Sequence, residues 1–164
     1  MKDDKTLKIT ALGDREIVML RQFDAPRRLL FDAWTKPEQV KQWLLGPPGW
    51  SMPVCEIDLK VGGTYRYVWR KNDGTEMGMR GVYREVVRPE RLVWTELFDE
   101  AWYTGESLIT TSLAEEGGRT TLTTTILYVS QEARDAVLKS GMERGVAASY
   151  DKLAELLASP GVAR

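Results

Sequence analysis

The protein has 164 residues, of which 43% are hydrophobic and 29% charged, values typical of one folded domain and unlike a disordered or collagen-like chain. Its 23 basic and 24 acidic side chains leave a net charge of −1, so it has no general attraction for nucleic acid or anionic membrane surfaces. The longest apolar runs, 17–20 and 126–129, are too short for a membrane helix or a signal peptide. We expect a cytoplasmic protein with neither nucleic-acid nor membrane partners.

Cysteine and histidine usage excludes much enzyme chemistry. The single cysteine, Cys55, has no partner for an internal disulfide, and the chain contains no histidine, which excludes serine–histidine and cysteine–histidine nucleophile systems. The acidic residues match no calcium-loop spacing, and imidazole ligands for a typical zinc site are missing. We therefore expect no metal and no cofactor, and we interpret Cys55 as an inert thiol.

The ends of the chain are predicted to be flexible, and one domain is predicted between them. Residues 1–14 are polar at the start and hold a short extended piece at 7–12 that is liable to fray, and residues 159–164 begin with Ser-Pro-Gly, whose proline and glycine close the ordered part. Residues 15–23 are rich in Ile, Val and Leu and predict the first strand. The predicted domain spans residues 15–158.

Two short helices are predicted after this strand. Asp24 and Pro26 are typical of a helix start. Thr35 and Glu38 have the spacing of a capping box for a second helix, whose apolar stripe includes Trp43. The Gly-Pro-Pro-Gly sequence at 46–49 must end that helix.

Strands dominate the middle of the chain. Residues 72–74 (Asn-Asp-Gly), 88–90 (Arg-Pro-Glu) and 116–118 (Glu-Gly-Gly) supply turns between extended runs, so the runs they join are predicted to form antiparallel hairpins. Parallel pairing would need crossovers of a dozen or more residues, which these links lack. The predicted strands of this meander are 51–58, 64–71, 76–87, 91–98, 106–114 and 119–129.

The last predicted element is a long helix over residues 131–158, capped by Ser130 and open to interruption at Ser140 and Gly141. Its apolar residues recur at a spacing of three to four and should lie against the sheet. This stripe comprises Met142, Val146, Ser149, Leu153 and Leu156 or Leu157.

Four segments in order resemble a known family. They are REIVMLRQFDAPRRLLFDAWTKPEQVKQWLLGP, DLKVGGTYRYVWRKNDG, GVYREVVRPERLVWTE and SGMERGVAASYDKLAELLA. They are similar to bacterial proteins grouped with the activator of heat-shock protein 90 ATPase homologues, in the START-related superfamily of polyketide cyclases and lipid-transfer domains. The resemblance implies an α+β helix-grip fold, in which a curved antiparallel sheet wraps the C-terminal helix and two short helices help to close a cavity. One departure is Leu44, where relatives often have a second tryptophan.

Aromatic side chains are the most informative candidates for the wall of such a cavity. Tyr65, Tyr67 and Trp69 alternate onto one face of their strand, as do Met77, Met79 and Tyr83 on the next. Tyrosine and tryptophan suit a pocket for a partly aromatic ligand, although ordinary core packing also explains each of them. The full set of predicted cavity residues is Trp43, Tyr65, Tyr67, Trp69, Met77, Met79, Tyr83, Trp94, Glu96, Met142, Val146 and Ser149.

Glu96 is the one carboxylate in this set, and it shares a strand face with Trp94. Facing inward, it would be a buried acid with raised proton affinity and a possible general acid or base. The alternative is that it pairs with Arg66, Arg80 or another cation at the sheet edge.

We interpret the chain as a non-catalytic binding domain for a hydrophobic or aromatic small molecule. The alternatives are a cyclase- or hydrolase-type enzyme that uses the same cavity and a chaperone ATPase cofactor. Eukaryotic activators of the chaperone carry an additional domain for which 164 residues leave no room, which disfavours the cofactor. A homodimer is a further alternative, because its interface would shield some of the many tryptophans from solvent.

Overall fold

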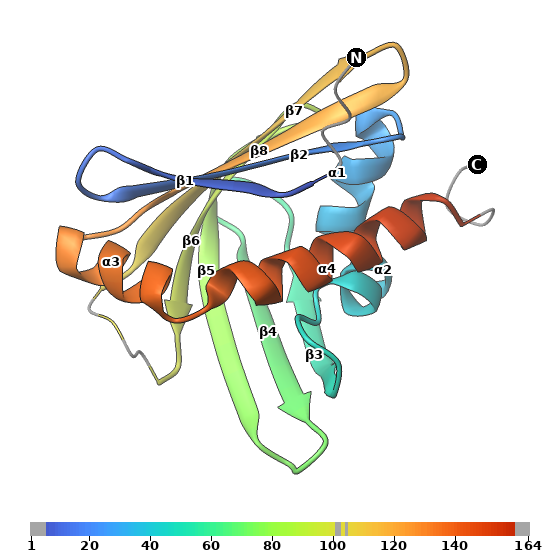
Figure 1. The fold of residues 1–164 in the computed structure, drawn as a ribbon. Helices are drawn as coiled ribbons and strands as arrows, with labels where there is room; N and C mark the ends of the chain where they lie inside the picture. Colours follow the sequence, from blue (N-terminus) through green and yellow to red (C-terminus); the bar gives the residue numbers. More distant parts are fainter. Residues whose placement is uncertain (1–5, 101–102, 104, 160–164) are drawn as a thin grey trace.

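The computed structural model describes residues 6–100, 103 and 105–159, which form one antiparallel sheet and four helices (Figure 1). The strand order in the sheet is β1-β2-β8-β7-β6-β5-β4-β3. The strands are β1 (Lys8–Leu12), β2 (Glu16–Phe23), β3 (Trp50–Ile57), β4 (Thr64–Lys71), β5 (Glu76–Val87), β6 (Arg91–Phe98), β7 (Ser107–Glu116) and β8 (Arg119–Leu127). The helices are α1 (Arg27–Thr35), α2 (Pro37–Trp43), α3 (Gln131–Lys139) and α4 (Met142–Leu157).

The predicted hairpins are confirmed. The turns at 72–74, 88–90 and 116–118 join the antiparallel pairs β4–β5, β5–β6 and β7–β8. The meander runs from β3 to β8, and β8 then pairs with β2, which brings the first part of the chain beside its later part. The sheet starts at β1, in the extended piece that precedes the predicted domain boundary, whereas residues 1–5 and 160–164 of the predicted flexible ends lie outside the described residues.

The N-termini of α1 and α2 differ from the prediction. The N-cap of α1 is Pro26, and Glu115 on β7 accepts a hydrogen bond of 2.9 Å from the Arg27 backbone N–H. The capping box is wrong, because Thr35 still belongs to α1 and donates its hydroxyl to the Phe31 carbonyl oxygen at 2.7 Å. A side chain 88 residues away therefore supplies the carboxylate at the start of α1.

The break in the last helix is confirmed and separates α3 from α4. Ser130 caps α3 by accepting a hydrogen bond from the Ala133 backbone N–H at 3.1 Å. Gly141, at φ 84°, turns the chain into α4 in the left-handed region that glycine adopts without strain. No helix within the described ranges is long and apolar enough to cross a membrane.

The long helix α4 crosses one face of the sheet, with α1 and α2 beside its C-terminal half (Figure 1). Leu153 of α4 is fully buried, as are Leu30 and Trp43 of the short helices. The Tyr150 ring lies 6.0 Å from the Phe23 ring and 6.2 Å from the Trp43 ring, centroid to centroid. This arrangement is the predicted α+β helix-grip fold, with a filled core at one end of α4.

A cavity under the N-terminal half of the last helix

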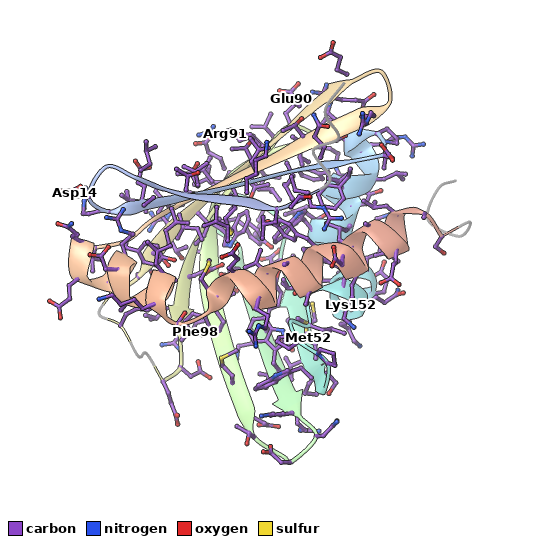
Figure 2. All side chains as sticks on the ribbon, in the orientation of Figure 1. Asp14, Met52, Glu90, Arg91, Phe98 and Lys152 are labelled. Atoms are coloured by element: carbon purple, nitrogen blue, oxygen red, sulfur yellow. The ribbon has the colours of Figure 1, made fainter. Side chains whose placement is uncertain are left out.

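A cavity of about 400 Å³ lies between the sheet and the N-terminal half of α4. Protein interiors leave few voids larger than a water molecule, so a space of this size is unusual. Figure 2 shows Phe98, one of its wall residues, at the end of β6 near the junction of α3 and α4. The predicted candidates that line it are Tyr67, Trp69, Met77, Met79, Tyr83, Trp94, Glu96, Met142, Val146 and Ser149.

The register of the sheet explains why these side chains meet. Tyr83 on β5 is opposite Trp94 on β6, and Trp94 is opposite Ile109 on β7. Directly opposed residues of antiparallel strands point to the same face, so their side chains form a continuous row across the sheet. A parallel row starts with Tyr67 on β4 and Met79 on β5. The two rows make an aromatic and apolar floor under α4.

Two candidates, Trp43 and Tyr65, do not line the cavity. Trp43 is fully buried, and its indole N–H donates to the Ala33 carbonyl oxygen at 2.8 Å, which fixes it between the two short helices. Tyr65 lies opposite Gly81, and its hydroxyl donates to the Thr95 carbonyl oxygen at 2.5 Å. Because Gly81 has no side chain, the Tyr65 ring fills that space and lies along the sheet.

The predicted set of cavity residues missed several aromatic wall residues, namely Trp34, Trp50, Phe98, Tyr103, Tyr128 and Tyr150. Helical spacing from Val146 and Leu153 could have placed Tyr150 on the inner face of α4. Strand alternation from Trp94 and Glu96 could likewise have placed Phe98, and helical spacing places Trp34 on the apolar stripe of α1, whereas Tyr103 and Tyr128 lie outside the strands, where no period applies. Trp34 packs edge to face against Trp43 at 4.6 Å, which ties the cavity wall to the core.

Small residues of α4 leave the cavity open beneath the helix. Gly145, Val146 and Ser149 line it, and the Ser149 hydroxyl accepts a hydrogen bond of 2.8 Å from the Gly46 backbone N–H. This bond holds the loop after α2 against the helix. Pro47 and Met77 both line the cavity and are exposed to solvent, so the entrance lies between this loop and the start of β5.

Glu96 brings the one carboxylate of the wall into this apolar space. Its Oε2 accepts a long hydrogen bond of 3.4 Å from the indole N–H of Trp94. The half-buried side chain faces the cavity. Desolvation raises its pKa from 4.5 to about 7, and the hydrogen bond from Trp94 partly opposes this rise. Near neutral pH this carboxyl group therefore exists in both its protonated and its ionised form.

The predicted pairing of Glu96 with Arg66 or Arg80 is wrong. Arg66 donates to Asp99 Oδ1 at 2.7 Å, and Arg80 donates to the same oxygen at 2.8 Å. Both bonds hold the pKa of Asp99 below its usual value. Asp99 directly follows β6 and points to the opposite face of the sheet from Glu96, the face that carries the two arginines. Glu96 is therefore left without a cation among the described residues.

The neighbouring phenol and thiol groups stay protonated at neutral pH. Burial is the main cause that raises the pKa of Tyr67, Tyr103 and Tyr128 above the usual value of 10, and the charge of Glu96 adds to it. Burial likewise raises the pKa of Cys55 to about 11, in line with an inert thiol. Within the described ranges no cluster of three or more cysteine or acidic side chains could hold a metal ion.

The sequence profile described as "Activator of Hsp90 ATPase homolog 1-like protein" matches residues 24–158, which include most of the cavity wall. The chain belongs to this family. Comparison with curated proteins gives no match.

Solved structures of bacterial proteins share the fold of this Hsp90 ATPase activator homologue-like protein. A crystal structure from Rhodobacter sphaeroides has a TM-score of 0.88 and 33% identity, covering 93% of this chain and 98% of that one. A crystal structure from Chromobacterium violaceum has a TM-score of 0.77 and 25% identity, covering 90% and 99%. The solution structure of an AHSA1-like protein from Aeromonas hydrophila has a TM-score of 0.70 at 19% identity, covering 87% and 94%, and shows likeness of fold alone.

Proposed function

We propose that the protein is a non-catalytic binding domain that holds a hydrophobic or aromatic small molecule in the cavity under α4. The observation that carries this proposal is the space of about 400 Å³ lined by aromatic and aliphatic side chains. Small-molecule sites typically have volumes of about 300–1,000 Å³, apolar walls and a few polar groups that orient the ligand. Glu96, Thr124 and Ser149 are such polar groups in this wall.

The aromatic wall favours a flat, partly aromatic ligand. Tyr67 and Trp69 have ring centroids 5.8 Å apart, and Trp34 and Trp94 have centroids 5.5 Å apart. Rings at such distances offer faces and edges on which a planar molecule can stack. A ligand of ~20 to ~24 heavy atoms at about 0.3 kcal/mol each would bind with roughly 6–7 kcal/mol, a dissociation constant of about 5–50 µM.

Titration with Nile red, a neutral fluorescent probe of this size, tests the proposal. We expect a saturable fluorescence increase with one site per chain. Val146→Phe places a ring in the cavity and should weaken probe binding strongly. Val61→Phe is the matched control, because Val61 is 67% exposed and lies outside the wall. Equal binding by both variants would place the probe elsewhere and contradict the proposal.

A second candidate function is favoured by Glu96. A carboxyl group whose pKa is about 7 in an apolar cavity has the proton affinity that a general acid or base needs near neutral pH. Native mass spectrometry of protein from its own host separates the two functions. If the protein releases the retained compound chemically unaltered, the result supports binding alone. If the native protein converts that compound to a product and Glu96→Gln does not, the result supports an enzymatic function.

A further inference from the structure

Among the described residues, the cavity wall has one carboxyl group and no basic side chain. Glu96 is this carboxyl group, and Asp99 holds Arg66 of β4 and Arg80 of β5. A ligand carboxylate or phosphate would meet no cation here and would lie close to a negative charge once Glu96 ionises. The wall therefore selects against anionic ligands.

Glu96 has unused capacity to accept hydrogen bonds. An ionised carboxylate offers about four lone-pair sites, and the one donor that reaches this side chain within the described structure is the Trp94 indole at 3.4 Å. Buried charges in proteins are normally paired or well hydrogen-bonded, because leaving them bare costs several kcal/mol. A donor on the ligand would supply what the protein wall does not.

Aromatic rings share the cavity wall with this carboxyl group, and its charge acts on the hydroxyls of Tyr103 and Tyr128. The Tyr103 ring lies 6.2 Å from the Phe98 ring and 5.6 Å from the Tyr128 ring, with both pairs edge to face. All three side chains line the cavity, together with Trp94. Ring faces attract cations within about 6 Å, and such cages recognise organic ammonium groups.

We propose that the ligand carries a basic nitrogen, so that its ammonium group binds Glu96 within the ring of Trp94, Tyr103 and Tyr128 while its apolar body fills the rest of the cavity. This inference rests on the proposed small-molecule function and names the chemical class of its ligand. The carboxylate supplies a charge-assisted hydrogen bond, and the rings supply a cation–π contribution.

The proposal implies a pH dependence that belongs to Glu96. Trp94 on its own strand donates to it, and its charge also acts on the hydroxyls of Tyr65 and Tyr67 on β4, Tyr103 before β7, Tyr128 after β8 and Tyr150 on α4. The pKa values of these tyrosines are raised above 10, so they stay neutral below pH 9. Amine affinity should therefore rise as pH increases through about 7, where Glu96 ionises.

Displacement of Nile red by three naphthalene compounds of nearly equal size tests the inference at pH 8. The compounds are 1-naphthylmethylamine, 1-naphthalenemethanol and 1-naphthoate. The amine should bind at least about tenfold more tightly than the alcohol, because it gains one charge-assisted hydrogen bond. The carboxylate should bind most weakly of the three. In Glu96→Gln the amine should lose this advantage, whereas the alcohol should change by less than about threefold.

Glu143→Gln is the matched control, because it removes an exposed carboxylate from the outer face of α4 and should leave the amine preference intact. An alcohol that displaces the probe as well as the amine does would overturn the ammonium proposal and leave the small-molecule function standing. Failure of Nile red to bind saturably would overturn both.

Discussion

The two halves of α4 lie on the same sheet but have opposite surroundings. Around the C-terminal half, Leu153 and Leu156 are buried in a core that α1 and α2 complete. Under the N-terminal half, Gly145 and Val146 face a cavity of about 400 Å³. The hollow therefore arises from small side chains on one helix segment above large aromatic side chains on the sheet.

Burial around the C-terminal half of α4 stabilises the fold, so the protein tolerates a cavity under the N-terminal half. Burial of large apolar side chains contributes about 1.5–3 kcal/mol for each one, and the fully buried residues Phe23, Leu30 and Leu153 lie outside the cavity wall. The wall residues still stabilise the domain, but their inner surfaces have no protein partner. A ligand that covers them would stabilise the folded state further.

The sharpest test of this comparison is a matched pair of truncations on α4. Leu153→Ala should lower the free energy of unfolding by about 2–5 kcal/mol, because Leu153 is 0% exposed and its truncation leaves a void in the filled core. Val146→Ala should cost less than about 1.5 kcal/mol, because its side chain already borders empty space. Urea unfolding of both variants measures the difference, and equal losses would mean that the two halves are packed alike.

The next largest effect concerns pH and Glu96. Between pH 4.5 and about 7 the unfolded protein ionises this carboxyl while the folded protein keeps it protonated. The folded state then binds more protons, so its free energy of unfolding falls as pH rises through this window and levels off above it. The shift corresponds to up to about 3 kcal/mol.

Glu96→Gln should remove that part of the slope and gain stability relative to the native protein at pH 8, while differing little at pH 4.5. Melting temperatures across this range measure it, with Glu143→Gln as the control for loss of an exposed carboxylate. An unchanged slope in Glu96→Gln would show that the hollow end does not desolvate this group.

The smallest expected effect tests whether the helix over the cavity has spare room. Gly145 lies inside α4, and a Cβ added to it would lie 3.8 Å from Pro47 Cδ, an ordinary contact distance. Gly145→Ala should therefore raise the free energy of unfolding by about 0.5–1 kcal/mol through higher helix propensity. A loss of stability on chemical unfolding would mean that the loop after α2 packs more tightly there than the structure indicates.

Local chemistry determined most of the elements of this fold. The turn residues at 72–74, 88–90 and 116–118 separated the strands, and the two-residue alternation placed Tyr67, Met79 and Trp94 on common faces. Gly141 marked the break between α3 and α4. These features depend on residues close in sequence, which is why they could be predicted without a structure.

Contacts between distant residues decided the rest. Glu115 approaches the start of α1 from β7, and the register of Gly81 opposite Tyr65 turns that ring away from the cavity. Asp99 binds both arginines, which leaves Glu96 alone in the wall. The sequence by itself determined the strand faces and the helix stripe that supply part of the cavity wall. The remaining wall residues, the volume of the cavity and the isolation of the carboxylate follow from tertiary packing, because they depend on which side chains compete for the same space and the same partner.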